Sequence, residues 1–210
     1  MDELMQVMAR GGVVIWIIAA LSVATLALAM WKLWWLLRAG AWSGARTETA
    51  LALWARGDAA EAEAILSMRR GLRARLAQSA MAAARALPEA EAREETLRVA
   101  RGLMAETRAG LRALELSAAI APLLGLLGTV IGMIAAFQAL QAAGARADPA
   151  TLAGGIWEAL LTTAAGMGVA ILASLALSWF ESVADQLAHD LEDIATRVFL
   201  ARPPAPEDRG

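Results

Sequence analysis

Two apolar stretches decide the fold: residues 121–140 read APLLGLLGTVIGMIAAFQAL, and residues 156–178 read IWEALLTTAAGMGVAILASLALS. Each is long enough for an α-helix to cross about 30 Å of bilayer hydrocarbon. Both carry glycine and threonine, and the second has the carboxylate of Glu158 near its start. Polar side chains are costly against lipid tails, so we expect these helix faces to turn away from lipid.

Small residues and hydroxyls fall on matching faces of these two helices. With about 100° between successive residues, one face of the first helix holds Gly125, Thr129, Gly132 and Ala136. The second helix has one stripe with two hydroxyls and an adjoining stripe with an acid and a threonine: the first is Thr163, Ala170 and Ser174, and the second is Glu158 and Thr162. Two such faces can pack together or can line a narrow polar path.

The same residues support a structural interpretation. Gly128 and Gly132 form a Gly-x-x-x-Gly pattern that lets membrane helices approach closely, and threonine can bond the carbonyl of its own preceding turn. We predict helix packing at Gly125, Gly128, Gly132 and Gly166. Glu158 favours a function, because an acid in a membrane helix must be paired, hydrated or at the interface. Its structural alternative is an acid at headgroup level that stabilises the helix dipole.

The composition is that of a membrane protein. Of the 210 residues, 59% are hydrophobic and 19% are charged, and the mean hydropathy is +0.51. A net charge of −2 offers no basic face for nucleic acid. Cysteine is absent, which excludes disulfides and thiolate metal sites, and a single histidine cannot form a histidine cluster. We therefore predict no cofactor, no metal and no nucleic-acid partner.

The sequence contains no catalytic constellation. It lacks a Gly-rich phosphate loop ahead of Lys-Ser or Lys-Thr, and it lacks a Gly-x-Ser-x-Gly motif. His189 lies beside Asp190 in an amphipathic pattern. A base without a positioned nucleophile has no catalytic use, so we expect His189 to be solvated or ion-paired and the protein not to be an enzyme.

A third apolar run predicts another membrane helix and sets the orientation. Residues 11–31 carry no charge, and the run is longer than the core of a signal peptide. The basic residues Lys32 and Arg38 follow it, and residues 38–115 hold most of the arginines. By the positive-inside rule this region is cytoplasmic, whereas the amino terminus and the 141–151 loop lie outside.

Short helices are predicted in residues 47–86. Gly57-Asp58 is typical of a helix stop followed by an N-cap. Leu87-Pro88-Glu89 is typical of a helix start, with proline in the first turn and an acid at the positive end of the dipole.

From Pro88 to the membrane we predict one unbroken helix. Its apolar stripe recurs every seven residues and ends with one further leucine: Leu97, Met104, Leu111 and Leu114. This stripe either packs on neighbouring helices or binds a partner. Pro122, near the membrane entrance, is expected to kink the helix.

The last membrane helix is expected to continue as an amphipathic helix. Apolar residues at spacings of three and four extend it: Phe180, Val183, Leu187, Leu191, Ile194 and Val198. Acids occupy the other faces, so this stripe should pack against the helix before Glu115. Beyond Arg202 the proline-rich composition predicts a disordered tail.

The runs at 121–137 (APLLGLLGTVIGMIAAF) and 152–171 (LAGGIWEALLTTAAGMGVAI) resemble the paired signature of the ExbB/TolQ/MotA family of proton-channel subunits. Residues 10–23 resemble the first ExbB helix more loosely, and the cytoplasmic part is similar only in size and helical character. Glu158 within Gly-Ile-Trp-Glu-Ala-Leu is similar to the ExbB/TolQ branch, because MotA-type subunits usually lack an acid there.

The resemblance implies a pentamer whose second and third membrane helices line a central pore. It also implies an ExbD/TolR-like partner with a single membrane helix, whose aspartate takes up and releases protons. Such a complex in a bacterial inner membrane would perform work on a TonB- or TolA-like protein that spans the periplasm. The polar positions of the family match Thr129, Glu158 and Thr163 as the proton path, with Thr162 and Ser174 as secondary pore-lining residues.

Two departures from the family pattern are present. Leu172 stands where members commonly have proline, and Leu177-Ser178 stands where they have Tyr-Asn. The alternatives to an ExbB-like channel are a structural membrane scaffold, a TolQ-type role in the envelope and a MotA-like stator subunit.

The predicted fold is an all-α integral membrane protein with three transmembrane helices and long helical cytoplasmic extensions. One copy cannot hide two polar membrane faces, so we expect an oligomer. The expected segments follow the chain: amino terminus and first membrane helix 1–40, cytoplasmic helices 41–115, second membrane helix 116–140, outer loop 141–151, third membrane helix 152–180, and amphipathic helix with tail 181–210.

Overall fold

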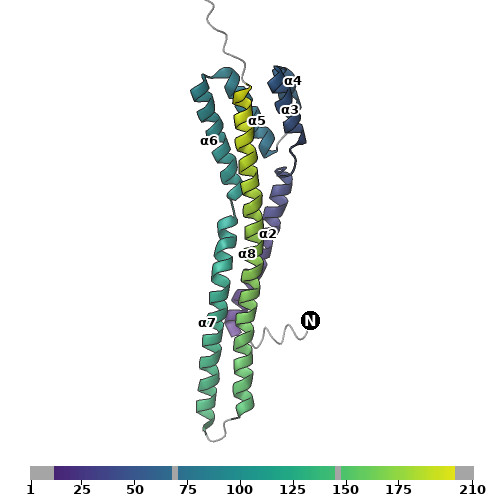
Figure 1. Cartoon of the computed structure of the whole chain (residues 1–210). Coiled ribbons are helices and arrows are strands. Elements are labelled where there is room, and N and C mark those ends of the chain that lie inside the picture. The colour runs from purple at the N-terminus through teal and green to yellow at the C-terminus, as the bar shows by residue number, and fades with distance from the viewer. Residues whose placement is uncertain (1–11, 68–70, 145–147, 202–210) are drawn as a thin grey trace, which may run out of the picture. The chain divides into compact units, whose positions relative to one another are not determined.

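The computed structural model describes residues 12–67, 71–144 and 148–201, and within these ranges its regular structure is helical (Figure 1). Three of the described stretches are long and apolar enough to cross a membrane: Gly12–Arg38, Glu89–Ala143 and Pro149–Leu200. The all-α class and the three predicted spans are confirmed, and the chain is a multi-pass membrane protein. The segment 1–11, residues 145–147 of the expected loop and the tail 202–210 lie outside the described residues.

The described helices are α2 (Gly12–Arg38), α3 (Ala45–Arg56), α4 (Ala59–Ser67), α5 (Leu72–Ala86), α6 (Glu89–Arg108), α7 (Leu111–Ala143) and α8 (Pro149–Leu200). They form two compact units. Unit 1 comprises Met1–Trp31 and Gly110–Trp179, and unit 2 comprises Lys32–Ala109 and Phe180–Gly210. The helices α2 and α8 each contribute residues to both units.

Unit 1 contains the apolar part of α2, all of α7 and the first part of α8. Its small buried cluster includes Val14 and Ile18 of α2, Ala121 of α7, and Val169 and Ala170 of α8. Most large apolar side chains on these helices remain exposed in the single chain. Such a surface suits lipid or another membrane helix rather than water.

Unit 2 has a conventional apolar core, to which α8 contributes the stripe predicted from its spacing. Leu187, Leu191, Ile194 and Val198 are buried together with side chains of α3 to α6. The indole N–H of Trp54 donates to the carbonyl of Val198 at 3.0 Å. The expected packing of the amphipathic extension against the helix before Glu115 is confirmed, because Leu103 of α6 belongs to this core, and α3 to α5 contribute as well.

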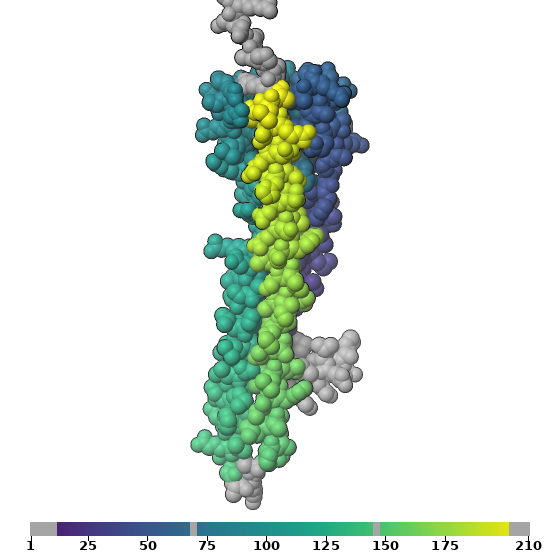
Figure 2. Space-filling model, viewed as in Figure 1, coloured from purple at the N-terminus to yellow at the C-terminus, as the bar shows by residue number. Residues whose placement is uncertain are grey.

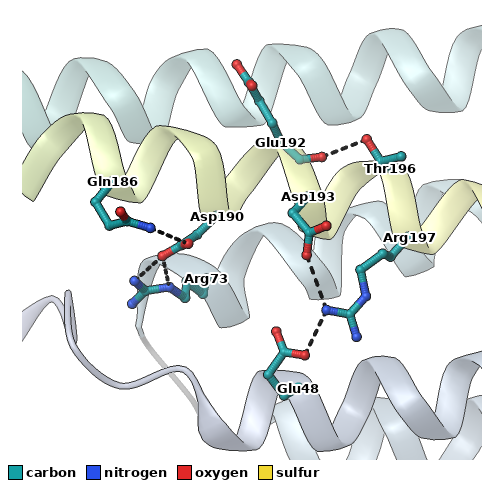
Figure 3. A network of polar contacts seen from close by, with 8 residues as sticks. All are labelled: Glu48, Arg73, Gln186, Asp190, Glu192, Asp193, Thr196 and Arg197. Carbon is teal, nitrogen blue, oxygen red and sulfur yellow. Dashed lines mark hydrogen bonds and ion pairs between the residues drawn. The ribbon is translucent and has the colours of Figure 1, made fainter.

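Figure 3 shows polar contacts that join this part of α8 to α3 and α5. Arg73 of α5 pairs with Asp190 of α8. Arg197 of α8 pairs with Glu48 of α3 at 2.7 Å and with Asp193 at 3.2 Å. The neighbouring His189 is exposed. These ion pairs fix the side of α8 that faces α3 and α5.

The helix boundaries at Gly57 and Pro88 follow the sequence signals. Gly57 ends α3 with φ 91°, a left-handed conformation that glycine adopts readily, and its N–H bonds the carbonyls of Leu53 and Trp54. Pro88 directly precedes α6, whose first turn carries Glu89 and Glu91. The predicted short helices before residue 86 are α3, α4 and α5.

The prediction of one unbroken helix from Pro88 into the membrane is wrong. The chain leaves the helix after Arg108, and Gly110 takes a left-handed conformation with φ 84° before α7 begins at Leu111. At this break, Lys32 Nζ donates to the carbonyls of Thr107 at 2.5 Å and Ala109 at 2.7 Å. The lysine therefore supplies donors that a continuing helix would otherwise have provided. Pro122, unlike Gly110, does not interrupt the helix: it lies within α7.

Candidate functional site

The helices α7 and α8 of unit 1 meet at a seam of small residues. A Cβ added to Gly125 would lie 2.9 Å from Cα of Thr163, and one added to Gly132 would lie 2.9 Å from Cβ of Ala159. A Cβ on Gly166 would lie 2.5 Å from the carbonyl oxygen of Ala121. Real Cβ atoms do not approach other atoms this closely, so glycine is required for the two backbones to meet.

Gly128 completes the predicted set of packing glycines. A Cβ on Gly128 would lie 2.8 Å from Cβ of Thr162 and 3.2 Å from Val14 of α2. The four predicted glycines therefore contact helices of the same chain. Helices of the same chain therefore cover the glycine face, and no second copy is needed to cover it.

Two neighbouring threonines of α8, Thr162 and Thr163, lie close to the carbonyl oxygen of Gly125 on α7. Thr163 Oγ1 donates to it at 2.9 Å. Thr162 Oγ1 lies 3.4 Å from the same oxygen and donates to Ala159 of its own turn at 2.7 Å. Thr162 is almost fully buried, with 3% of its surface exposed. The hydroxyl of Thr163 thus binds α8 to the middle of α7, and that of Thr162 lies beside the same carbonyl while it bonds within its own helix.

Thr129 and Ser174 lie apart from this seam. Thr129 Oγ1 donates to the carbonyl of Leu126 in its own helix at 2.7 Å, and the residue is half-buried. Ser174 is exposed. Among the described residues, neither hydroxyl makes a hydrogen bond to Glu158, although all three side chains belong to helices of unit 1.

Glu158 lines a cavity of about 440 Å³ that lies between α2, α7 and α8 of unit 1. The walls come from Gly12 and Val14 of α2, Gly128 and Ala136 of α7, and Thr162 beside Glu158 on α8. The lining is mostly apolar, and Glu158 itself is half-buried. The structure therefore brings Glu158 together with Thr162 rather than with Thr163.

Two contributors to this region were not predicted from the sequence. Gly155 meets Ala136 so closely that an added Cβ would lie 2.7 Å from that alanine's Cβ. The first turn of α2 supplies a wall of the cavity. The small residues Gly155, Ala159, Thr162 and Gly166 follow each other at spacings of four, three and four, a helical signal that could have identified the seam.

Comparison with known proteins gives a family for this architecture. The model of the MotA/TolQ/ExbB proton channel family matches residues 66–193, which is more than half of the chain. The match includes α7, the seam and Glu158.

Several curated proteins are similar over shorter regions. A biopolymer transport protein described as ExbB-like, from Synechocystis sp., is 49% identical over 84 residues, which cover 39% of this chain and 33% of the relative. The biopolymer transport protein exbB1 of Vibrio cholerae is 42% identical over 86 residues, 39% of this chain and 38% of the relative. The biopolymer transport protein ExbB of Xanthomonas campestris is 38% identical over 116 residues, 52% of this chain and 42% of the relative.

The aligned regions cover well under two thirds of these relatives, so the comparison establishes the family and not the activity of a whole protein. Proteins of this family are channels and transporters rather than enzymes. Three apolar helices, a glycine seam between the second and third, and a family match that spans this seam lead to one conclusion: the chain belongs to the MotA/TolQ/ExbB proton channel family.

Proposed function

We propose that this chain is the channel-forming subunit of an ExbB/TolQ-like complex that couples proton motive force to mechanical work. The observation that carries the proposal is the carboxylate of Glu158 in a cavity among three membrane helices, beside Thr162. A carboxylate at membrane depth needs hydration or a partner. Since liquid water occupies about 30 Å³ per molecule, a cavity of this size can hydrate the acid.

In this proposal the proton path uses Glu158, Thr129 and Thr163. Glu158, near the outer end of α8, accepts and releases protons. Thr129 and Thr163 offer hydroxyls to water or to the carboxylate of a partner, and Thr162 and Ser174 line the path. Each threonine hydroxyl now bonds a backbone carbonyl and keeps lone pairs that can accept a hydrogen bond.

The assembly in the proposal follows the family. Five copies surround a pore lined by α7 and α8, and an ExbD/TolR-like protein places its single membrane helix inside. The complex lies in a bacterial inner membrane, with the amino terminus in the periplasm and the carboxyl terminus in the cytoplasm, as the arginine distribution favours. Its work is done on a TonB- or TolA-like protein that spans the periplasm.

Glu158→Gln tests the role of the acid, because glutamine keeps size and polarity but cannot ionise. We expect proton flux through the reconstituted complex to fall by about tenfold or more, and Glu158→Asp to retain part of it. Flux is measured in liposomes with a pH-sensitive dye, together with the oligomer mass. Glu181→Gln, which removes an exposed acid outside unit 1, serves as the matched control. Wild-type flux in Glu158→Gln would reduce Glu158 to a helix-end acid.

A structural membrane scaffold is the second candidate, and one observation favours it: the hydroxyl of Thr163 binds α8 to the carbonyl of Gly125 on α7. A scaffold needs the threonines of this region only for packing, whereas a channel also needs their hydroxyls for proton transfer.

Thr129→Val and Thr163→Val separate the two functions, since valine keeps the shape and removes the hydroxyl. Loss of one hydrogen bond in a membrane costs about 1 kcal/mol, so both variants should assemble with the partner. We expect both to lose most proton flux. Thr49→Val is the control, because Thr49 also bonds its own preceding turn, at 3.1 Å from Ala45, but lies in unit 2. Full flux in both membrane variants would support the scaffold.

A further inference from the structure

Unit 2 carries an apolar groove between α6 and α8 that the proposed proton path does not use. Its volume is about 360 Å³, and its lining includes Ala100 and Met104 of α6 with Leu191 and Phe199 of α8. Leu97 of α6 borders it and is 48% exposed. A large aliphatic side chain exposed beside an apolar hollow is typical of an interaction surface.

The helices α6 and α8 run in opposite directions along this groove. Arg93 of α6 lies 4.8 Å above the ring of Phe199 at one end, and Arg108 pairs with Asp185 at 3.2 Å beyond the other end. Figure 2 shows the last part of α8, in yellow, beside α6, in teal. The groove therefore opens beside the carboxyl end of α8.

The charges on the rim leave one arginine available. The lining includes Arg93 and Arg101 of α6 and Glu192 of α8. Arg93 pairs with Glu89 at 2.7 Å. Arg101 is exposed, and no ion pair is found for it among the described residues. Its guanidinium can therefore donate hydrogen bonds to a carboxylate that enters the groove.

The segment that follows α8 has chemistry complementary to this groove. Residues 202–210 read RPPAPEDRG, so three prolines are followed directly by Glu207 and Asp208. Such a segment cannot form a core of its own, but proline favours the polyproline II conformation, which docks into apolar grooves lined by aromatic side chains. A proline stretch followed by two carboxylates matches an apolar groove that begins at Phe199 and has Arg101 further along it.

The lengths of the segment and of the groove agree as well. Because α6 and α8 are antiparallel, Arg101 lies at the height of residue 191, about 15 Å along α8 from Ala201. Arg202 precedes a proline, which disfavours the helical conformation, so the chain can turn away from the axis of α8 there. A polyproline II chain advances about 3.1 Å per residue and covers this distance in about five residues, which end at Glu207.

We propose that residues 203–208 fold back along the α6–α8 groove of the same chain, with the carboxylates of Glu207 and Asp208 accepting hydrogen bonds from Arg101. A segment tethered at the mouth of the groove has an effective concentration of about a millimolar, so even a weak contact is occupied. This tether favours the chain's own segment over a separate peptide. The inference goes beyond the proposed function and does not depend on it.

The other side chains of the segment also have places in this arrangement. The prolines cover the exposed side chain of Leu97. Arg202 stays at the end of α8, outside the groove, and Arg209 comes within reach of Glu192 on the opposite rim. The bound segment thus closes the groove to other apolar ligands.

Cysteine cross-linking in native membranes tests the contact, because the sequence contains no cysteine. Leu97 lies at the height of residue 195, about 9 Å from residue 201, so the same spacing places Ala205 beside it. The variant with both Leu97→Cys and Ala205→Cys should form a disulfide within one chain on mild oxidation, which needs Cα atoms within about 7 Å. A polyethylene glycol maleimide, which adds mass at each free thiol, should then leave most chains monomeric and unshifted on a denaturing gel.

Arg98→Cys combined with Ala205→Cys is the matched control. Arg98 is exposed and follows Leu97 on α6, but it does not line the groove. This pair should stay reduced and take up two labels. Equal protection of both pairs would mean that the segment is not held in the groove, and free thiols in the Leu97 pair would mean that it does not reach it; either result overturns the proposal.

The size of the cross-linked product identifies any other occupant. A disulfide-linked dimer would mean that the segment binds the groove of a second copy, and a link to a different protein would mean that a partner occupies it. Both results overturn the proposal.

Charge reversal tests the contact at Arg101 in the same double-cysteine variant. Arg101→Glu should slow disulfide formation by about threefold or more, the effect expected of an exposed ion pair, whereas Arg98→Glu should leave the rate unchanged. Adding Glu207→Lys and Asp208→Lys to Arg101→Glu should restore the rate, because the pair then forms with opposite signs. An unchanged rate in Arg101→Glu, or no recovery in the combined variant, overturns the placement of the two acids at Arg101.

Discussion

Gly166→Leu is expected to remove most of the folded protein, because Gly166 has no room for any side chain. A Cβ at this position would lie 2.5 Å from the carbonyl oxygen of Ala121 and 3.0 Å from Cα of Gly125. Both obstacles are backbone atoms of α7, so a rotamer change cannot relieve the clash. Overpacking costs about 1 to 3 kcal/mol even where neighbouring side chains can shift, and a leucine against backbone should exceed this range. Gly166→Ala should fall within it.

Gly168→Leu is the matched control, since it lies two residues further along the same helix. An added Cβ there has no atom within 4 Å in the described chain. Leucine also favours the helix by nearly 1 kcal/mol over glycine. Thermal unfolding in detergent, followed by tryptophan fluorescence, should show a large loss for Gly166→Leu and little change for Gly168→Leu. Equal midpoints for the two variants would mean that α7 and α8 do not meet at Gly166.

Periodicity and composition predicted most elements of this fold, with the exception of the break between α6 and α7. Uncharged runs of membrane-crossing length predicted the three spans, and the spacing of Leu187, Leu191, Ile194 and Val198 predicted the buried side of α8. Gly57 identified a helix end because its left-handed conformation disfavours other residues. These signals are local, so they can be read from neighbouring residues alone.

The candidate site was predicted in its residue types but not in its partners. Helical spacing put Glu158 and Thr162 on one stripe, yet only the positions of α2 and α7 show that this stripe faces a cavity. The glycine face suggested contact with some helix, and the structure identifies α8 of the same chain. Which of two neighbouring threonines shares a space with the acid depends on how α7 and α8 are rotated, which the pattern leaves open.

The break between α6 and α7 could not be predicted because its stabilising partner is distant in sequence. Gly110 alone is a weak signal, since isolated glycines occur within helices. Lys32, which binds the carbonyls exposed at the break, is 75 residues away from Thr107. In the sequence, Lys32 is evident only as a positive charge after the uncharged run 11–31, where it helped to predict the orientation in the membrane.

Lys32→Met should destabilise the protein strongly for the same reason. The Lys32 side chain is 1% exposed, and its ammonium bonds the carbonyl of Thr107 in the last turn of α6 and that of Ala109 just after it. Methionine keeps the apolar stem, so the core packing is preserved while both donors are lost. Burying a lysine has its own desolvation cost, which methionine removes. That gain is smaller than the loss, because each buried carbonyl without a donor costs about 1 to 3 kcal/mol.

We therefore expect Lys32→Met to lower the free energy of unfolding by about 2 to 4 kcal/mol, the larger part of it at the α6–α7 break. Urea titration measures the total, and trypsin cleavage after Arg108 measures the local opening. Arg38→Met is the matched control: Arg38 is exposed and lies over the ring of Trp34 at 4.1 Å, so its loss should cost about 0.5 to 1 kcal/mol. If Lys32→Met lowered the free energy of unfolding no more than Arg38→Met does, and cleavage after Arg108 were not faster, Lys32 would not stabilise the α6–α7 break. Since a lysine can also be replaced by a longer cation, partial recovery in Lys32→Arg would show that the donors, rather than the stem, stabilise the end of α6.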